Sequence, residues 1–221
     1  MNRREFSKQA SALSSLGLAT ALAPMGLAQA GEAAPAEGTN YVKLGSRAPV
    51  SAPPGKIEVV EFFWYGCPHC NHFEPYLAAW AAKLPPDVAF RRVPVAFREV
   101  PFAIHQRLYF ALEGMGVLQS MHAKVFHAIH EEHVKLDTPE AITDFVVKQG
   151  LDKDKFTAMF NAFSMPNKSK QARALAEAYK IDGVPTLGIA GKYFTSVSLN
   201  GTPEKTLATT DFLIAQERKA K

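Results

Sequence analysis

The two cysteines of this chain, Cys67 and Cys70, lie three residues apart and directly follow a segment with the character of a buried strand. Residues 56–64 (KIEVVEFFW) are rich in β-branched and aromatic side chains and are apolar on both faces. This pattern is typical of a central strand that is covered on both sides. No other cysteine is present, so the core must form without several disulfides, and the pair is expected to serve chemistry.

A crossover from this strand to a second, parallel strand is expected next. Pro68 should lie in the first turn of a helix, where its missing N–H costs nothing, and Pro75 should kink that helix. Residues 88–95 again have strand character. The order strand, cysteine-bearing turn, helix, strand predicts a right-handed crossover in a partly parallel sheet.

Only helical signals follow between residues 101 and 179. Strand character then returns in two short segments, 185–190 and 193–197, and a final helix follows. The expected helix N-caps in this second half of the chain are Thr138, Asp152 and Thr202. The sequence thus predicts an α/β fold in which a small domain is interrupted by a helical one. The predicted boundaries are 31–100 and 181–221 for the α/β domain and 101–180 for the insertion.

The first thirty residues resemble an export signal rather than part of the fold. A basic start precedes a mildly apolar stretch, 11–27, and the small-residue end Ala28-Gln29-Ala30. Arg3-Arg4 matches a twin-arginine signal, but a general secretory leader with two arginines is equally compatible. We therefore expect residues 1–30 to be a signal peptide, by either route, and the mature chain to be soluble and periplasmic.

The net charge of +4 does not indicate a nucleic-acid protein. Basic residues are spread along the chain, and the adjacent pairs are Arg3-Arg4, Arg91-Arg92 and Arg218-Lys219. A basic stripe interleaved with aromatic residues, the usual mark of nucleic-acid binding, is absent from the sequence. No nucleic-acid partner is expected, and the chain is predicted to be a monomer.

The spacing of the cysteine pair predicts a redox site. A cysteine at a helix N-terminus faces free backbone N–H groups and the positive end of the helix dipole, which favour its thiolate. We assign Cys67 as the exposed attacking sulfur and Cys70, one turn on, as the buried resolving one. Pro68 fixes the turn, and His69 can add positive charge or a hydrogen bond to the Cys67 thiolate. A Cys67 pKa three units below pH 7 would be worth about 4 kcal/mol, or about 90 mV of oxidising potential.

Other roles for the cysteine pair have less support in the sequence. A zinc site usually takes four ligands, and there is no second cysteine pair, although His69 and His72 could be proposed. Haem attachment needs a histidine directly after Cys70, where Asn71 stands. A structural disulfide across so short a loop would add little stability.

Four histidines and an aromatic group in the predicted insertion have simpler interpretations than a cofactor site. The histidines, spread over more than a third of a helical wheel, suit a solvated helix face better than a metal site: 122, 127, 130 and 133. The aromatic and aliphatic side chains Phe102, Leu108, Tyr109 and Phe110 are expected in the insertion core. No metal is expected.

Two segments resemble the DsbA family of thiol–disulfide oxidoreductases. Residues 59–70 (VVEFFWYGCPHC) are similar to its active-site segment, and residues 183–186 (GVPT) to its cis-proline loop. The resemblance covers about residues 41–221 and implies a thioredoxin-like fold with an inserted helical domain. It also implies that Pro185 is cis beside the cysteine pair and that the Val184 backbone is free to pair with an extended substrate.

The same resemblance assigns further residues and partners. Glu61, six residues before Cys67, matches a buried acid under the active site, and Thr186 would tune the couple from the loop. The implied substrates are reduced, unfolded exported proteins, and a quinone-linked membrane oxidase of the DsbB type would reoxidise the enzyme. The redox-active Cys67–Cys70 disulfide would be the only redox group, with no bound cofactor.

The sequence thus predicts a dithiol oxidase that introduces disulfide bonds into exported proteins. A periplasmic disulfide reductase stays open, because the direction depends on His69 and on the loop around Pro185. An isomerase would be expected to carry an added dimerisation domain, for which no length remains after residue 30. Outside the enzymes, a peptide-binding chaperone or a metal carrier is possible. Thiol exchange that vanishes in Cys67→Ser would separate an oxidoreductase from these.

Overall fold

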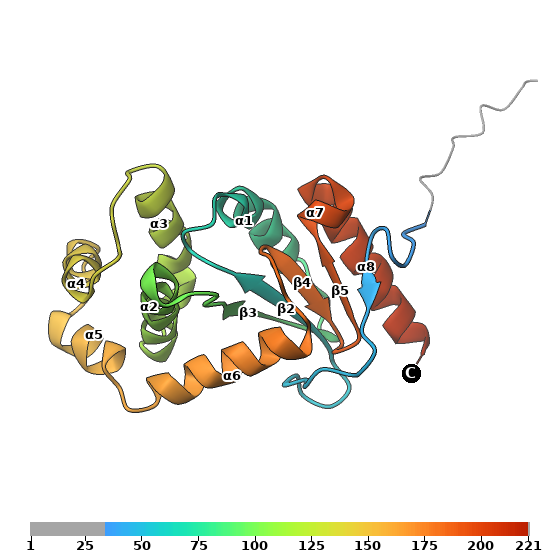
Figure 1. Cartoon of the computed structure of the whole chain (residues 1–221), viewed down its shortest axis with the longest axis horizontal. Helices are drawn as coiled ribbons and strands as arrows, with labels where there is room; N and C mark the ends of the chain where they lie inside the picture. The colour runs from blue at the N-terminus through green and yellow to red at the C-terminus, as the bar shows by residue number, and fades with distance from the viewer. Residues whose placement is uncertain (1–33, 221) are drawn as a thin grey trace, which may run out of the picture. The chain divides into compact units, whose positions relative to one another are not determined.

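A computed structural model describes residues 34–220, and the predicted signal peptide lies outside this part of the chain. The centre of the fold is a five-stranded sheet in the order β1-β5-β4-β2-β3 (Figure 1). Strands β2 and β3 run parallel, and the other neighbours run antiparallel. The strands are β1 (Val42–Lys43), β2 (Ile57–Phe63), β3 (Val88–Pro94), β4 (Thr186–Ile189) and β5 (Tyr193–Ser196).

The cysteine-bearing helix α1 (Pro68–Ala81) connects β2 to β3, which confirms the predicted crossover. It continues as one helix through Pro75. Two further helices follow β5, namely α7 (Val197–Asn200) and α8 (Pro203–Lys219). The structure therefore has the thioredoxin-like α/β fold that the sequence predicts.

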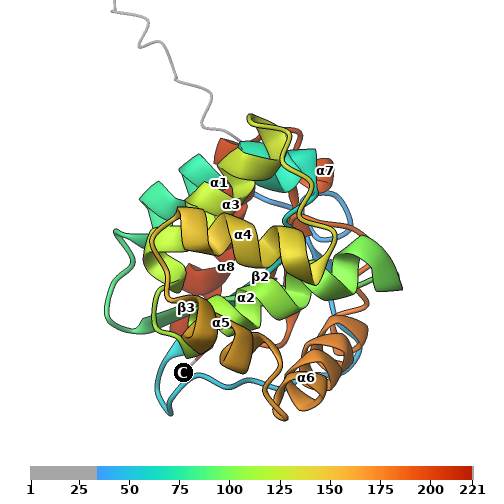
Figure 2. The ribbon, with the colours of Figure 1, turned by 90° about the vertical axis from the view of Figure 1, so that its left-hand side faces the viewer.

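A helical segment lies between β3 and β4 in the chain, where the sequence predicts the insertion. Its elements are a π-helical segment η1 (Glu99–Ala103) and the helices α2 (Ile104–Gly114), α3 (Leu118–His130), α4 (Pro139–Lys148), α5 (Lys153–Phe160) and α6 (Met165–Ala178). Figure 2 looks onto this helical segment, with α4 and α5 in front. It clusters with the α/β part as one compact unit, Ala34–Lys221, and the exact domain boundaries remain a prediction.

Strand β2 is covered on both faces, as its apolar sequence requires. Ile57 and Val59 belong to a core shared with residues of α1 and α8. Val60 and Phe62 point the other way, into a core built largely from the helical segment. All seven residues of β2 are buried, so the loop that carries the cysteines starts from a strand that is enclosed along its whole length.

The three predicted N-caps are confirmed. The side chains of Thr138, Asp152 and Thr202 each accept a hydrogen bond from the backbone N–H three residues on, at 2.9–3.2 Å. The predicted late hairpin is also present, although Val197 belongs to α7 rather than to β5. In the described part of the chain, no helix is long and apolar enough to cross a membrane.

Candidate active site

The cysteine pair lies at the start of α1, just beyond the end of β2. Cys67 is the N-cap residue and Pro68 the first helical residue, as predicted. The Cys67 backbone N–H donates to the carbonyl of Trp64 at 3.0 Å, which closes the turn between strand and helix. Cys70 is fully buried, whereas Cys67 is 7% exposed and therefore less open than the sequence suggests. Both are free thiols in the structure.

The two sulfurs differ strongly in ionisation. The pKa of Cys67 is lowered from 9.0 to about 6, chiefly because the Cys70 side chain donates a hydrogen bond to its sulfur. Burial opposes this effect, and the backbone N–H groups of Cys70 and His69 and the charge of His69 add to it. Burial is the main reason that the pKa of Cys70 is raised. Cys67 is therefore the better leaving group and the more readily ionised thiol.

The pKa shift of Cys67 below neutral pH is smaller than the three units considered from the sequence. A Cys67 pKa of about 6 lies one unit below pH 7, rather than three. Ionisation at this sulfur then accounts for about 30 mV of potential instead of about 90 mV. His69 contributes, but the Cys70 thiol contributes more.

The loop before β4 reaches the cysteine pair. The Val184–Pro185 peptide bond is cis, as the family resemblance implies. The Cys67 thiol donates to the Val184 carbonyl oxygen, with 3.5 Å between sulfur and oxygen. Thr186 donates from its hydroxyl to the Gly183 carbonyl at 2.8 Å, which holds the loop in a tight turn. Residues far apart in the sequence thus meet at the Cys67 sulfur.

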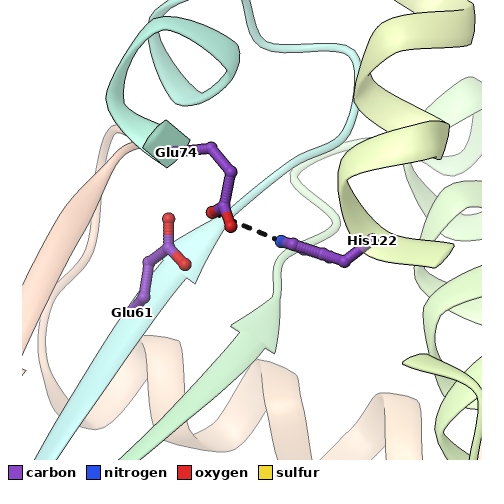
Figure 3. Close-up of side chains that lie close together, drawn as sticks. All are labelled: Glu61, Glu74 and His122. Carbon is purple, nitrogen blue, oxygen red and sulfur yellow. Dashed lines mark ion pairs between the residues drawn. The ribbon is translucent and has the colours of Figure 1, made fainter. Parts of the chain in front are cut away.

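A buried polar network near the pair includes Glu61, Glu74 and His122, which are drawn in Figure 3. Glu61 is 1% exposed, and its Oε2 accepts from Arg92 at 2.9 Å. Arg92 also donates to Glu74 Oε1 at 2.7 Å, and Glu74 Oε2 lies 3.5 Å from His122 Nε2. The His122 Nδ1 is 2.9 Å from the Tyr65 hydroxyl.

The two carboxyl groups of this network titrate in opposite directions. Burial raises the pKa of Glu61 to about 8 against the opposing charge of Arg92. Burial also acts on Glu74, but its contacts with His122 and Arg92 outweigh it, so the pKa of Glu74 is lowered. At neutral pH, Glu61 is therefore mostly protonated and Glu74 ionised.

Three side chains of this network are of the types that bind metal ions. Ligand atoms of Glu61, Glu74 and His122 all lie within 4.8 Å of one another, which is close enough for one cation. The Arg92 guanidinium already pairs with both carboxylates, however, and its charge would repel a divalent ion. The arrangement therefore favours a protonated carboxyl group at Glu61 over a bound metal ion.

The cysteine segment, the cis-proline loop and the buried acid all match the family resemblance, and comparisons with known proteins decide the family. Residues 58–208 match the family model of the DsbA-like thioredoxin domain. The thiol:disulfide interchange protein DsbA of Pseudomonas aeruginosa is 48% identical over 183 residues, which cover 83% of this chain and 86% of that protein. The DsbA of Burkholderia cepacia is 44% identical over 209 residues, covering 95% and 96%. This chain belongs to the DsbA-like thioredoxin family.

Solved structures agree with this assignment. A crystal structure of Pseudomonas aeruginosa DsbA has a TM-score of 0.79 and 48% identity, covering 83% of this chain and 94% of that one. The DsbA of Xylella fastidiosa has a TM-score of 0.78 and 36% identity, covering 84% and 98%. The DsbA-like chain is accordingly a thiol:disulfide oxidoreductase.

One sequence expectation about the histidines of this DsbA-like chain is wrong. His122 does not lie on a solvated helix face: it is 4% exposed and faces Glu74 and Tyr65. His130 is half-buried, and its Nε2 donates to the Tyr65 carbonyl at 2.8 Å. His127 and His133 are exposed, as expected. The wheel pattern failed because α3 packs on the active-site loop along the face that carries His122 and His130.

The interpretation of Phe102 is also corrected. Leu108, Tyr109 and Phe110 are buried, but Phe102 is only partly buried and stacks on Trp64 with 3.9 Å between ring centroids. Trp64 directly precedes Tyr65 and the cysteine turn, so Phe102 belongs to the rim of the active site. Two neighbours on this side, Phe97 and Val100, are 45% and 69% exposed. An apolar surface therefore continues from Trp64 along η1.

Proposed function

We propose that this chain is a periplasmic dithiol oxidase that introduces disulfide bonds into reduced, unfolded exported proteins. The observation that carries the proposal is the unequal pair at the start of α1. Cys67 has a lowered pKa and contacts the cis-proline loop, whereas Cys70 is buried and has a raised pKa. Such a pair favours its dithiol form and so tends to pass its disulfide on.

The reaction follows from the chemistry of thiol exchange. A substrate thiolate attacks the Cys67 sulfur of the Cys67–Cys70 disulfide, forms a mixed disulfide with it and releases the Cys70 sulfur. A second substrate thiolate then attacks the substrate sulfur of that mixed disulfide and expels Cys67 as a thiolate. The substrate loses two electrons and gains a disulfide, and the enzyme is left as a dithiol. Because leaving thiols of low pKa depart faster, the lowered pKa of Cys67 favours the second step, in which Cys67 is expelled.

Several neighbouring residues have proposed roles in this reaction. The Val184 backbone would pair with an extended substrate strand, with Pro185 holding it beside Cys67 and Thr186 closing the loop. Glu61, protonated at neutral pH, would exchange a proton with the sulfurs. The apolar surface from Trp64 to Val100 suits unfolded chains, which expose apolar side chains.

The names of the relatives support the remaining parts of the proposal. They are thiol:disulfide interchange proteins called DsbA, so we propose a quinone-linked membrane partner of the DsbB type for reoxidation. Residues 1–30 would direct export to the periplasm through the general secretory or the twin-arginine route. The redox-active disulfide would need no further cofactor.

The direction of the reaction is tested by equilibrating the protein with glutathione buffers. We expect a potential well above that of thioredoxin, which is about −270 mV. A value near that of thioredoxin would make the chain a reductase. Cys67→Ser should abolish oxidation of a reduced model substrate, whereas Cys70→Ser, mixed with a model substrate in its disulfide form, should accumulate the mixed disulfide through Cys67. Exchange that survives in Cys67→Ser would contradict the proposal.

A further inference from the structure

We infer that His122, on the helical segment, is a positioning residue for the cysteine pair, because it fixes the shared proton of two buried carboxyl groups on Glu61 rather than on Glu74. The inference rests on the proposed role of Cys67 as the attacking sulfur. It adds an element outside the α/β part of the fold to the redox site, since α3 lies between β3 and β4 in the chain.

The hydrogen bonds of His122 determine which of its ring nitrogens carries the proton. Tyr65 is 1% exposed, and burial raises the pKa of its hydroxyl, so this group stays protonated. With 2.9 Å between them, the Tyr65 hydroxyl donates to His122 Nδ1. The hydrogen of a neutral imidazole then lies on Nε2, which faces Glu74 Oε2 at 3.5 Å. Figure 3 shows this ring aimed at Glu74.

The network contains two carboxyl groups but one guanidinium, so one of the two carboxyl groups should carry a proton. Two carboxylates face one guanidinium, Arg92, and all three groups are buried or nearly so. An uncompensated second negative charge is costly in such surroundings, so one carboxyl keeps its proton. Glu74 lies against both Arg92 and His122, the latter at 3.5 Å, whereas Glu61 has Arg92 alone. The proton therefore resides on Glu61, and its pKa of about 8 agrees.

Three buried polar atoms make this network sensitive to His122. Glu61 Oε1, Glu74 Oε2 and His122 Nε2 have no hydrogen-bond partner within the usual distance. The 3.5 Å contact to His122 is thus what distinguishes the second oxygen of Glu74 from that of Glu61. Tyr109 on α2 also lies near Arg92, and its hydroxyl donates to the Arg92 carbonyl at 3.2 Å.

The place of this proton matters for Cys67. An ionised Glu61 and the Cys67 thiolate are both negative and repel each other. A neutral Glu61 therefore favours formation of the thiolate. Without the contact from His122, the proton moves to Glu74 and Glu61 becomes ionised beside Arg92. The Cys67 thiolate then faces a negative charge, and the pKa of Cys67 rises.

Two substitutions at one position test the inference. In His122→Asn, the shorter amide can still meet Tyr65 but loses Glu74, whereas in His122→Gln the longer amide reaches Glu74 and loses Tyr65. Thiolate absorbance in the ultraviolet is followed against pH for the reduced proteins. We expect the pKa of Cys67 to rise by about half a unit in His122→Asn, about a threefold loss of thiolate at acidic pH. His122→Gln should stay close to the parent protein.

His127→Gln is the matched control, since His127 lies on the same helix with an exposed side chain. In the background of Glu61→Gln, where position 61 cannot ionise, His122→Asn should no longer change the pKa of Cys67. An effect that persists there would overturn the inference, as would equal effects of the Asn and Gln variants. The nitrogen chemical shifts of His122 in the unaltered protein give an independent check, and hydrogen on Nδ1 would also overturn it. None of these measurements needs oxidase activity, so failure of the proposed function is seen separately.

Discussion

At the scale of single residues, the ionisation of Cys67 depends most on its partner in the pair. The Cys70 side chain is the largest cause of the lowered pKa of Cys67, ahead of the backbone amides and of His69. The reason is geometric: Cys70 lies one helical turn after Cys67 and is fully buried, so its thiol is held against the first sulfur. In the reduced pair, Cys70 is thus the hydrogen-bond donor and the Cys67 sulfur the acceptor.

This geometry predicts different effects for two replacements of Cys70. Cys70→Ala removes the donor, so the pKa of Cys67 should rise from about 6 by about one unit. Cys70→Ser keeps a hydroxyl donor at the same place and should raise it less. The rate of alkylation by iodoacetamide, followed against pH, reports the Cys67 thiolate in both variants. Identical midpoints for the Ala and Ser variants would show that the side-chain hydrogen bond is not the main cause.

The sequence predicts the site residues that stand in short motifs, but not those whose partners lie far away in the chain. Cys67, Cys70 and Pro185 stand in short motifs whose spacing carries the information. Arg92 and His122 do not, because their partners lie 31 and 57 residues away in the chain, at Glu61 and Tyr65. A sequence pattern on one helix cannot indicate which other element that helix will pack against.

At the scale of elements, β4 is shaped by a close approach to the end of the helical segment. A Cβ at Gly188 would lie 2.4 Å from the ring of Tyr179, the residue that ends α6. The Tyr179 ring is fully buried, and its hydroxyl accepts from the Gly191 N–H at 2.9 Å. The glycine thus allows the ring to lie directly against the strand that follows the cis-proline loop.

Gly188→Ala is therefore expected to destabilise the protein by about 1–3 kcal/mol, because neither the ring nor the strand has room to move. Gly45→Ala is the control, since no atom lies within 4 Å of its added Cβ and its φ is not positive. Urea unfolding of the two variants against the parent protein gives the free energies. Equal stability of the two variants would mean that Tyr179 can shift at little cost.

Two of the shortest elements could not be predicted from the sequence, for a related reason. Strand β1 has two residues and exists through its pairing with β5, and α7 has four residues and begins at the Ser196 cap. Neither is long enough to show a periodicity. The caps at Thr138, Asp152 and Thr202 were predictable because a cap is a contact within four residues.

At the scale of the whole molecule, the redox state and the stability of the fold are linked through Cys67. In the reduced folded protein its pKa is about 6, whereas an unfolded thiol ionises near 9. A group whose pKa is depressed by folding contributes stability that is fully present above the unfolded pKa. That contribution is lost as the pH falls through the folded pKa. Reduced protein should therefore gain stability as the pH rises from about 6 towards 9.

The oxidised protein provides the comparison, because a Cys67 held in a disulfide does not titrate. Glu61 titrates in both forms, so its effect largely cancels in the difference between them. Between about pH 5 and about pH 8, we expect the stability of the reduced form relative to the oxidised form to grow by about 1–2 kcal/mol. The full linkage value is larger, and solvent screening of a sulfur in contact with water reduces it. Measurements stay below pH 9, because the raised pKa of Cys70 acts in the opposite direction at higher pH. Urea unfolding of both forms across this range decides the matter: a difference that stays constant or shrinks with rising pH would mean that folding does not favour the Cys67 thiolate.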